Sequence, residues 1–219
     1  MLKISLNPLN EAEKGILFSL TPFFKQEGLL SGGTSLMLQI PFRKSYDFDL
    51  FFPFEIPLSF ARKAASIFNS KIEVLINTPD ELTFIAHNQS KISFIFFPFK
   101  RKYKPVNAEN SISLSSYKDI ASDKAYVIGR RPEYRDYMDL FIILKNGFGL
   151  KRVIVDAKEK FAGEFSEKLF LSQLIYFEDL KDFTVELIKE KYSVNEVKIF
   201  FKQAVLNYLQ EFAFTTFKY

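Results

Sequence analysis

Short runs of β-branched and aromatic residues fill the first half of the chain and predict a series of strands. These runs are bounded by Gly, Pro, Asn and Asp residues, as strands usually are. Apolar positions at helical spacing precede and interrupt the runs, which predicts two helices. A sheet packed by helices follows from this mixture. The expected strands are residues 36–40, 45–52, 71–77, 82–86 and 91–97, and the expected helices are residues 10–27 and 57–70.

The second half of the chain has a different pattern. After a polar stretch at residues 104–113, strand signals fade and helical periodicity continues to the C-terminus. The expected helices are residues 117–130, 132–146, 166–180 and 193–212, the last beginning with a capping box from Ser193 to Glu196. We therefore predict two domains, an α/β domain over residues 1–105 and a helical domain over residues 106–219.

The composition of the chain limits the partners and the metal sites that it can have. The chain of 219 residues carries 30 Lys and Arg against 26 Asp and Glu, a net charge of +4 that mildly favours an anionic partner such as RNA or a nucleotide. It has no cysteine and one histidine, His87, so disulfides, thiolate metal sites and histidine zinc sites are excluded. Any metal must be bound mainly by oxygen. No secretory signal and no bilayer-length apolar run is evident, so we expect a cytoplasmic protein without a membrane partner.

Two aspartates interrupt the apolar run YDFDLF. Because side chains alternate along a strand, Asp47 and Asp49 share one face about 6–7 Å apart, while Phe48 and Leu50 point to the other. Two carboxylates on one face repel each other unless a cation lies between them, and Mg²⁺ prefers carboxylate and phosphate oxygens. The pair predicts a metal site for nucleotide chemistry. A solvated sheet edge with an acidic outer face is the alternative interpretation.

A glycine turn precedes the two aspartates. Gly32 and Gly33 let backbone N–H groups approach a phosphate, and Thr34 suits the N-cap of a short helix. Arg43 could screen phosphate charge or protect a strand edge, and Ser45 falls on the same face as the aspartates. A glycine turn followed by D-x-D resembles the polymerase-beta-like nucleotidyltransferase superfamily.

Charged residues also stand in unusual places in the helical half. Lys124 projects from the middle of an apolar stripe, where an unpaired ammonium is costly to bury, so an anionic partner is expected. A lysine that reaches out to solvent at a domain edge is the alternative. On the next predicted helix, Arg135, Asp136 and Asp139 form a narrow polar stripe, which could also be a plain surface ion pair between Arg135 and Asp139.

Two separated motifs together resemble the AbiEii-type nucleotidyltransferase family, toxins of abortive-infection and toxin–antitoxin systems. The first motif is similar to the family's G-G-T-A-L…R-x-S-x-D-x-D-L-F and matches at Gly32, Gly33, Thr34, Leu36, Arg43, Ser45, Asp47, Asp49, Leu50 and Phe51. The second is similar to D-I-A-x-x-K…R…R-D-x-x-D-L and matches at Asp119, Ile120, Ala121, Lys124, Arg130 or Arg131, Arg135, Asp136, Asp139 and Leu140. The C-terminal helices carry no motif of the family.

The resemblance implies an α+β fold, a polymerase-beta-like mixed sheet flanked by helices and followed by a C-terminal helical domain that completes the active-site cleft. It implies that Asp47 and Asp49 bind Mg²⁺, with Mn²⁺ as a substitute, and that Lys124 and Asp139 complete the catalytic site. The expected nucleotide-binding residues are Gly32, Gly33, Thr34, Arg43, Ser45 and Lys124. Arg130, Arg131, Arg135 and Asp136 are expected to hold the acceptor or to support the site.

The resemblance also implies an activity, the transfer of a nucleoside monophosphate from an NTP with release of pyrophosphate. Acceptors in the family are often RNA, notably a tRNA 3′ end, and sometimes protein, and a cognate antitoxin is the expected partner. One departure concerns the third carboxylate of polymerase-beta-like enzymes, because residues 91–97 offer only Ser93 and no acid. Either Glu73 or Asp139 would then take that role.

The sequence is also compatible with two other functions. One is a catalytically silent scaffold that binds a nucleotide or a partner protein. The other is a small-molecule nucleotidyltransferase acting on an antibiotic or a sugar, which shares the first motif but explains the pair Lys124 and Asp139 less well.

Overall fold

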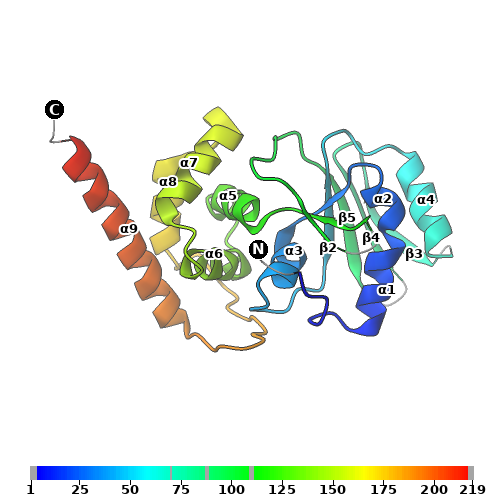
Figure 1. Ribbon diagram of the computed structural model, residues 1–219, viewed down its shortest axis with the longest axis horizontal. Coiled ribbons are helices and arrows are strands. Elements are labelled where there is room, and N and C mark those ends of the chain that lie inside the picture. Colours follow the sequence, from blue (N-terminus) through cyan, green and yellow to red (C-terminus); the bar gives the residue numbers. More distant parts are fainter. Residues whose placement is uncertain (1–3, 70, 87–88, 109–110, 217–219) are drawn as a thin grey trace. The chain divides into compact units, whose positions relative to one another are not determined.

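The computed structural model describes residues 4–69, 71–86, 89–108 and 111–216 (Figure 1). The single histidine, His87, lies outside these residues. The chain forms two compact units, Met1–Tyr117 and Lys118–Tyr219. The division falls after Tyr117 rather than after residue 105, because the short strands that follow residue 105 still belong to the sheet of the N-terminal unit.

A mixed sheet of seven described strands forms the centre of the N-terminal unit, in the order β3-β4-β5-β2-β1-β7-β6. The pairs β2–β5 and β1–β7 are parallel, and the other neighbours are antiparallel. The strands are β1 (Leu29–Leu30), β2 (Phe48–Phe52), β3 (Ile72–Asn77), β4 (Glu81–Ala86), β5 (Lys91–Phe96), β6 (Val106–Asn107) and β7 (Ser113–Leu114). This mixed sheet with its helices confirms the predicted α+β fold class.

Three helices cover one face of this sheet, α1 (Glu11–Ser19), α2 (Thr21–Phe24) and α4 (Ser59–Ile67) (Figure 1). Phenylalanine rings fill the layer between them, since Phe23 of α2 and Phe60 of α4 both contact Phe94 of β5 at centroid distances of 4.5 and 6.0 Å. Burying aromatic rings in edge and tilted contacts is a large source of packing energy. The helices α1, α2 and α4 therefore cover the apolar face of the sheet.

The expected strand at residues 36–40 is wrong, because that segment lies in helix α3 (Gly32–Gln39). Residues 34–39 are all buried, so their apolar pattern has no period that could distinguish a helix from a strand. The expected helix over residues 10–27 divides into α1 and α2, with Pro22 in the first turn of α2, where its missing N–H costs nothing. The expected strand from residue 45 begins at Phe48.

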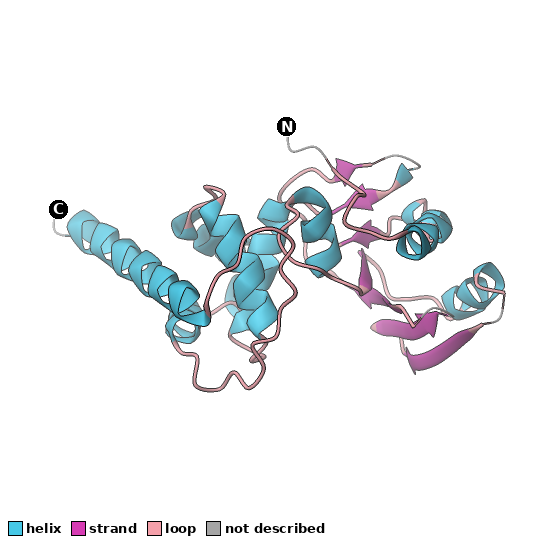
Figure 2. Ribbon diagram, turned by 90° about the horizontal axis from the view of Figure 1, so that it is seen from below, coloured by secondary structure: helices cyan, strands magenta, loops and turns pink. Residues whose placement is uncertain are grey.

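The C-terminal unit is built from helices, as predicted (Figure 2). They are α5 (Tyr117–Ile128), α6 (Tyr134–Lys145), α7 (Leu150–Phe161), α8 (Glu167–Ile175) and α9 (Val194–Thr216), with a short 3₁₀ turn at Ala162–Glu164. The capping box of α9 is present, since Ser193 N donates to Glu196 Oε2 and Glu196 N donates to Ser193 Oγ. Helix α7 was not predicted. Within the described residues, no helix combines the length and the apolar character that crossing a bilayer requires.

Candidate active site

The side chains of strand β2 form an apolar face and an acidic face, as the alternation predicts. Phe48, Leu50 and Phe52 are buried, whereas Asp49 and Phe51 are half-buried on the opposite face. Asp47 directly precedes the strand, and its side chain is 38% exposed. Residues two apart in an extended segment share a face, so both carboxylates lie on the side that α1, α2 and α4 leave uncovered.

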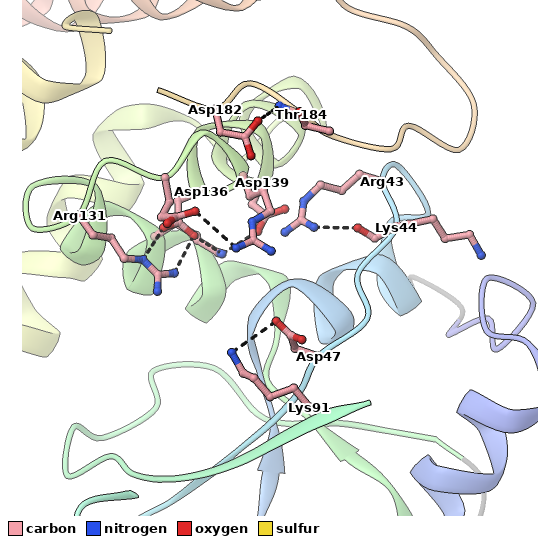
Figure 3. Close-up of polar contacts among 12 residues, drawn as sticks. Arg43, Lys44, Asp47, Lys91, Arg131, Asp136, Asp139, Asp182 and Thr184 are labelled. Carbon is pink, nitrogen blue, oxygen red and sulfur yellow. Dashed lines mark hydrogen bonds and ion pairs between the residues drawn. The ribbon is translucent and has the colours of Figure 1, made fainter. Parts of the chain in front are cut away.

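A lysine that the sequence analysis missed lies beside these carboxylates. Lys91 begins β5, the parallel neighbour of β2, and its Nζ is 3.8 Å from Asp47 Oδ2 (Figure 3). Its side chain is 45% exposed, so the pair is a surface ion pair of small energy. The alternation along residues 91–97 indicates that Lys91 and Ser93 share one face of a strand. It does not indicate that this strand lies next to the strand of Asp47 and Asp49, because that pairing depends on the tertiary fold.

The glycine turn packs directly against Asp49. Gly32 begins helix α3 with φ of +64°, a left-handed conformation that side chains disfavour. A Cβ on Gly32 would lie 2.8 Å from Asp49 Oδ2. Ser31 N also donates to the carbonyl oxygen of Asp49 at 2.8 Å. The first turn of α3, with backbone N–H groups that have no partner within the helix, is thereby held next to a carboxylate.

The second glycine makes room for two side chains of the loop that leads to Asp47. A Cβ on Gly33 would lie 2.6 Å from Arg43 Nη2 and 2.7 Å from Ser45 Oγ. Arg43 Nη1 in turn donates to the carbonyl oxygen of Lys44 at 2.8 Å (Figure 3). Both expected nucleotide-binding side chains therefore lie against the glycine turn, where only glycine leaves them space.

Thr34 does not cap a helix as expected. The N-cap position of α3 is Ser31, and it makes no side-chain capping hydrogen bond. Thr34 Oγ1 instead donates to the carbonyl oxygen of Asp47 at 2.5 Å and lies 3.0 Å from Ser45 Oγ. Its role in the structure is to fasten the segment that carries Asp47 onto α3.

The third carboxylate of polymerase-beta-like enzymes has no equivalent on β5. Ser93 occupies the position in register with Asp49, and Thr83 Oγ1 of β4 lies 2.9 Å from Ser93 Oγ. Glu73 lies on β3, so three strand spacings of about 4.8 Å separate it from β2, too far for a shared metal ion. Among the described residues, no three acidic or histidine side chains gather around a common metal position.

Lys124 has the anionic partners that its position predicts. Its Nζ lies 2.6 Å from Asp136 Oδ1 and 2.6 Å from Asp139 Oδ2, and these carboxylates stand one turn apart on α6. The three side chains are 9%, 2% and 1% exposed, respectively, so Lys124 does not reach out to solvent. Asp139 is buried against Lys124 rather than forming the surface pair with Arg135 that was the alternative interpretation.

The three arginines near this cluster have different partners. Arg131 Nε and Nη2 bind Asp136 Oδ2 and Oδ1 at 2.8 and 3.1 Å, a bidentate fork (Figure 3). Arg130 stacks on Tyr126, with its guanidinium carbon 3.6 Å from the ring centroid. Arg135 is exposed and lies 3.4 Å from Glu133. Arg131 is therefore the arginine that joins the cluster of Lys124, Asp136 and Asp139.

A second buried cluster, which the sequence analysis missed, joins helices α5 and α7. Lys160 Nζ lies 3.1 Å from Asp119 Oδ1 and 2.6 Å from Asp123 Oδ1. The side chains of Lys160 and Asp119 are each 1% exposed. Asp119 belongs to the second motif, and this contact assigns it a packing role, that of fixing the helix that carries Lys124.

The acid sensitivity of the C-terminal unit is expected to depend on Asp136. Burial opposes its ionisation, but the Lys124 charge and the Arg131 hydrogen bonds outweigh burial and lower its pKa from 3.8 to about 2. A lowered pKa in the folded state stabilises the protein above the unfolded pKa, and this stabilisation is lost as pH falls toward the folded value. We expect about 2 kcal/mol of unfolding free energy to disappear between about pH 4 and pH 2.

Urea unfolding followed by far-UV circular dichroism at several pH values measures this dependence, and Asp136→Asn is the matched control. The variant should lose less stability over the same interval than the wild type does. Parallel pH profiles for the two proteins would contradict the role given to Asp136.

The predicted site residues thus fall into two groups, each assembled within its own unit. The glycine turn, Arg43, Ser45, Asp47 and Asp49 come together in the N-terminal unit. The cluster of Lys124, Arg131, Asp136 and Asp139 comes together in the C-terminal unit. That the two groups form one active site stays a prediction.

Comparison with solved structures identifies the fold. The chain resembles JHP933 from Helicobacter pylori with a TM-score of 0.57 and 15% identity, over 99% of this chain and 100% of that one. It resembles MenT4, the nucleotidyltransferase toxin Rv2826c from Mycobacterium tuberculosis H37Rv, with a TM-score of 0.57 and 11% identity, over 88% of this chain and 81% of that one. The chain has the nucleotidyltransferase fold, which confirms the AbiEii-type resemblance at the level of the fold.

Sequence comparison identifies a family. No family model matches the chain. The uncharacterized protein aq_aa25 from Aquifex aeolicus (strain VF5) is 33% identical over 190 residues, which are 83% of this chain and 87% of that protein. The chain belongs to the same family as aq_aa25.

Proposed function

We propose that the protein is a Mg²⁺-dependent nucleotidyltransferase that moves a nucleoside monophosphate from an NTP to an RNA acceptor, such as a tRNA 3′ end, and releases pyrophosphate. One observation carries the proposal. The N-terminal turn of α3 packs so closely on Asp49 that a Cβ at Gly32 would lie 2.8 Å from its carboxylate. Phosphate-binding N–H groups and a carboxylate pair therefore share one face. The likeness to MenT4, a nucleotidyltransferase toxin, supports the class.

The residues of this face suit an oxygen-coordinated divalent cation. Asp47 and Asp49 offer carboxylate oxygens on the face that α1, α2 and α4 leave uncovered, and Mg²⁺ characteristically takes one or two protein carboxylates together with substrate phosphates. Mn²⁺ accepts the same ligands. When bound, the metal supplies Lewis-acid stabilisation of the charge that develops on the phosphoryl oxygens.

The remaining residues of the face act on the triphosphate. The N–H groups of the first turn of α3 hold phosphate oxygens, because they point away from the helix and carry its positive dipole. Arg43 and Ser45, packed on Gly33, add a positive charge and a hydroxyl beside the same turn. Thr34 keeps Asp47 in place through its 2.5 Å hydrogen bond to the Asp47 carbonyl oxygen. Holding the reactants in line in this way is the main contribution of such a site.

In this proposal Lys124 stabilises the charge that grows on the departing pyrophosphate. Its ammonium is fixed by Asp136 and Asp139, both at 2.6 Å, so little reorganisation is needed during the reaction. Asp139 then acts as a positioning residue for Lys124 rather than as a metal ligand. As the toxin of a toxin–antitoxin or abortive-infection system, the protein would be silenced by a cognate antitoxin protein.

The test is a labelling reaction with purified protein, Mg²⁺, total RNA and each of the four α-³²P-labelled NTPs in turn. We expect one or more NTPs to label an RNA species of tRNA size, and we expect a chelator to abolish the labelling. A parallel reaction without RNA detects transfer to protein. Label that appears on no macromolecule, with or without Mg²⁺, would contradict the proposed function.

A further inference from the structure

An aromatic and basic cluster lies on the same face of the sheet as the carboxylates. We define it as the platform of Phe51, Phe97 and Arg101. The rings of Phe51 and Phe97 stack at 4.8 Å between centroids with an interplanar angle of 29°. The guanidinium carbon of Arg101 lies 4.3 Å from the Phe97 centroid and 5.2 Å from the Phe51 centroid. All three residues are half-buried, so part of each residue stays accessible to solvent.

The platform is adjacent to the candidate metal ligands. Phe51 follows Asp49 by two residues on β2, so it lies on the same face about 7 Å farther along the strand. Phe97 N donates to the carbonyl oxygen of Phe52 at 2.7 Å, which continues the parallel pairing of β5 with β2 beyond the end of β5. The platform therefore extends the acidic face within the N-terminal unit.

The segment that carries Phe97 and Arg101 has the composition of a polyanion site. Residues 97–108 contain three aromatic residues, four basic residues and no acid. The basic residues are Lys100, Arg101, Lys102 and Lys104. Basic side chains interleaved with aromatic ones bind single-stranded nucleic acid, because the charges follow the backbone phosphates and the rings stack with bases.

The platform and the glycine turn lie on opposite sides of β2. The sheet order places β5, which leads into Phe97 and Arg101, on one side of β2 and β1, which leads into Gly32, on the other. In phosphoryl transfer the attacking and leaving oxygens are roughly in line on opposite sides of the phosphorus. If the glycine turn holds the leaving pyrophosphate, the acceptor approaches from a direction away from that turn, and the platform on the β5 side of β2 meets this requirement.

We propose that the platform of Phe51, Phe97 and Arg101 stacks the terminal bases of a single-stranded RNA 3′ end, while Lys100, Lys102 and Lys104 contact its phosphates. This inference rests on the proposed function, since it names the acceptor and the place where the acceptor binds. A protein acceptor would require neither a stacking surface nor a run of cations without acids. The base of the incoming NTP would lie on the side of the glycine turn.

The test is the fluorescence anisotropy of a short 5′-labelled single-stranded RNA, titrated with protein in the absence of NTP and in the presence of chelator. Arg101→Ala and Phe97→Leu are expected to raise the dissociation constant about tenfold, since stacking is worth about 1–3 kcal/mol per base. Binding of an NTP with Mg²⁺, measured by equilibrium dialysis, should not change in either variant.

A second test uses a variant whose substitutions lie at the surface rather than in the core. Lys100 and Lys104 are exposed, so Lys100→Gln/Lys104→Gln should keep the fold. It should reduce the slope of log K against log salt by about 1.4, as expected for two lost phosphate contacts on a single strand. Arg62→Gln/Lys71→Gln, which removes two exposed cations elsewhere in the same unit, is the matched control and should leave the slope unchanged.

The outcomes separate this inference from the proposed function. Wild-type affinity for RNA in all the platform variants, or NTP binding that weakens in their place, would overturn the platform as an acceptor site. Transfer of label only to protein or to a small molecule would also overturn it and leave nucleotidyl transfer standing. RNA binding that depends on the platform, in a protein that transfers no nucleotide, would uphold the platform and remove the proposed function.

Discussion

Replacing Asp49 with asparagine is expected to slow nucleotidyl transfer by about 10³-fold, since a metal-binding carboxylate supports several kcal/mol of transition-state stabilisation and each 1.36 kcal/mol is a factor of ten. Asparagine has the shape of aspartate but lacks the charge. The hydrogen bond from Ser31 N to the carbonyl oxygen of residue 49 uses the backbone, so the variant should keep it. The fold should therefore survive while the reaction does not.

The measurement is the initial rate of RNA labelling at saturating NTP and Mg²⁺, with circular dichroism to verify the fold. Glu73→Gln is the matched control, because it removes one carboxylate charge from the same sheet at exposed strand β3. The control should retain the wild-type rate. A rate for Asp49→Asn within about tenfold of wild type, a loss of only about 1.4 kcal/mol, would argue against the carboxylate pair as the catalytic centre.

Replacing Lys124 with methionine is expected to lower the free energy of unfolding by about 3–5 kcal/mol, the usual cost of removing one partner from a buried ion pair. Methionine fills a similar volume, so the loss comes from charge rather than from a cavity. Asp136 keeps the fork of Arg131 at 2.8 and 3.1 Å. Asp139, which is 1% exposed, loses the ammonium that lies 2.6 Å away.

Urea unfolding followed by far-UV circular dichroism measures this loss. The double variant Lys124→Met/Asp139→Asn should recover a large part of it, because it removes the buried charge along with its partner. Lys151→Met provides the surface control, since Lys151 is 68% exposed and pairs with Glu211 at 3.6 Å. A loss no larger for Lys124→Met than for this control would show that the cluster contributes little to stability.

The strand that carries the aspartates could be predicted from the sequence, and the segment before it could not. Alternation of Phe48 and Leu50 with Asp49 gives β2 a clear period of two, so its two faces follow directly. Helix α3 has no such period because it is buried on all sides, and its start depends on the left-handed backbone of Gly32. An apolar run of that kind can be predicted as either element.

The site was predictable where a single residue conflicts with its local environment. Lys124 in an apolar stripe requires an anion, so the sequence alone predicts a partner, and the next helix supplies it. The residues next to Lys91 and Lys160 in the sequence do not indicate that either lysine needs an anionic partner. Their partners, Asp47 and Asp119, are brought to them by the register of β5 against β2 and by the packing of α7 on α5. Such contacts follow from the tertiary fold and not from local pattern.

Lys91 places a positive charge beside the carboxylates of the acidic face, and a metal ion could replace this charge. Its ammonium is 3.8 Å from Asp47, and both side chains are well exposed, at 45% and 38%. An exposed pair of this kind is worth no more than about 1 kcal/mol, so it screens repulsion between the carboxylates without competing seriously with a doubly charged ion. Without a metal the face is therefore partly neutralised, and under the proposed function it would still accept a metal that arrives with its nucleotide.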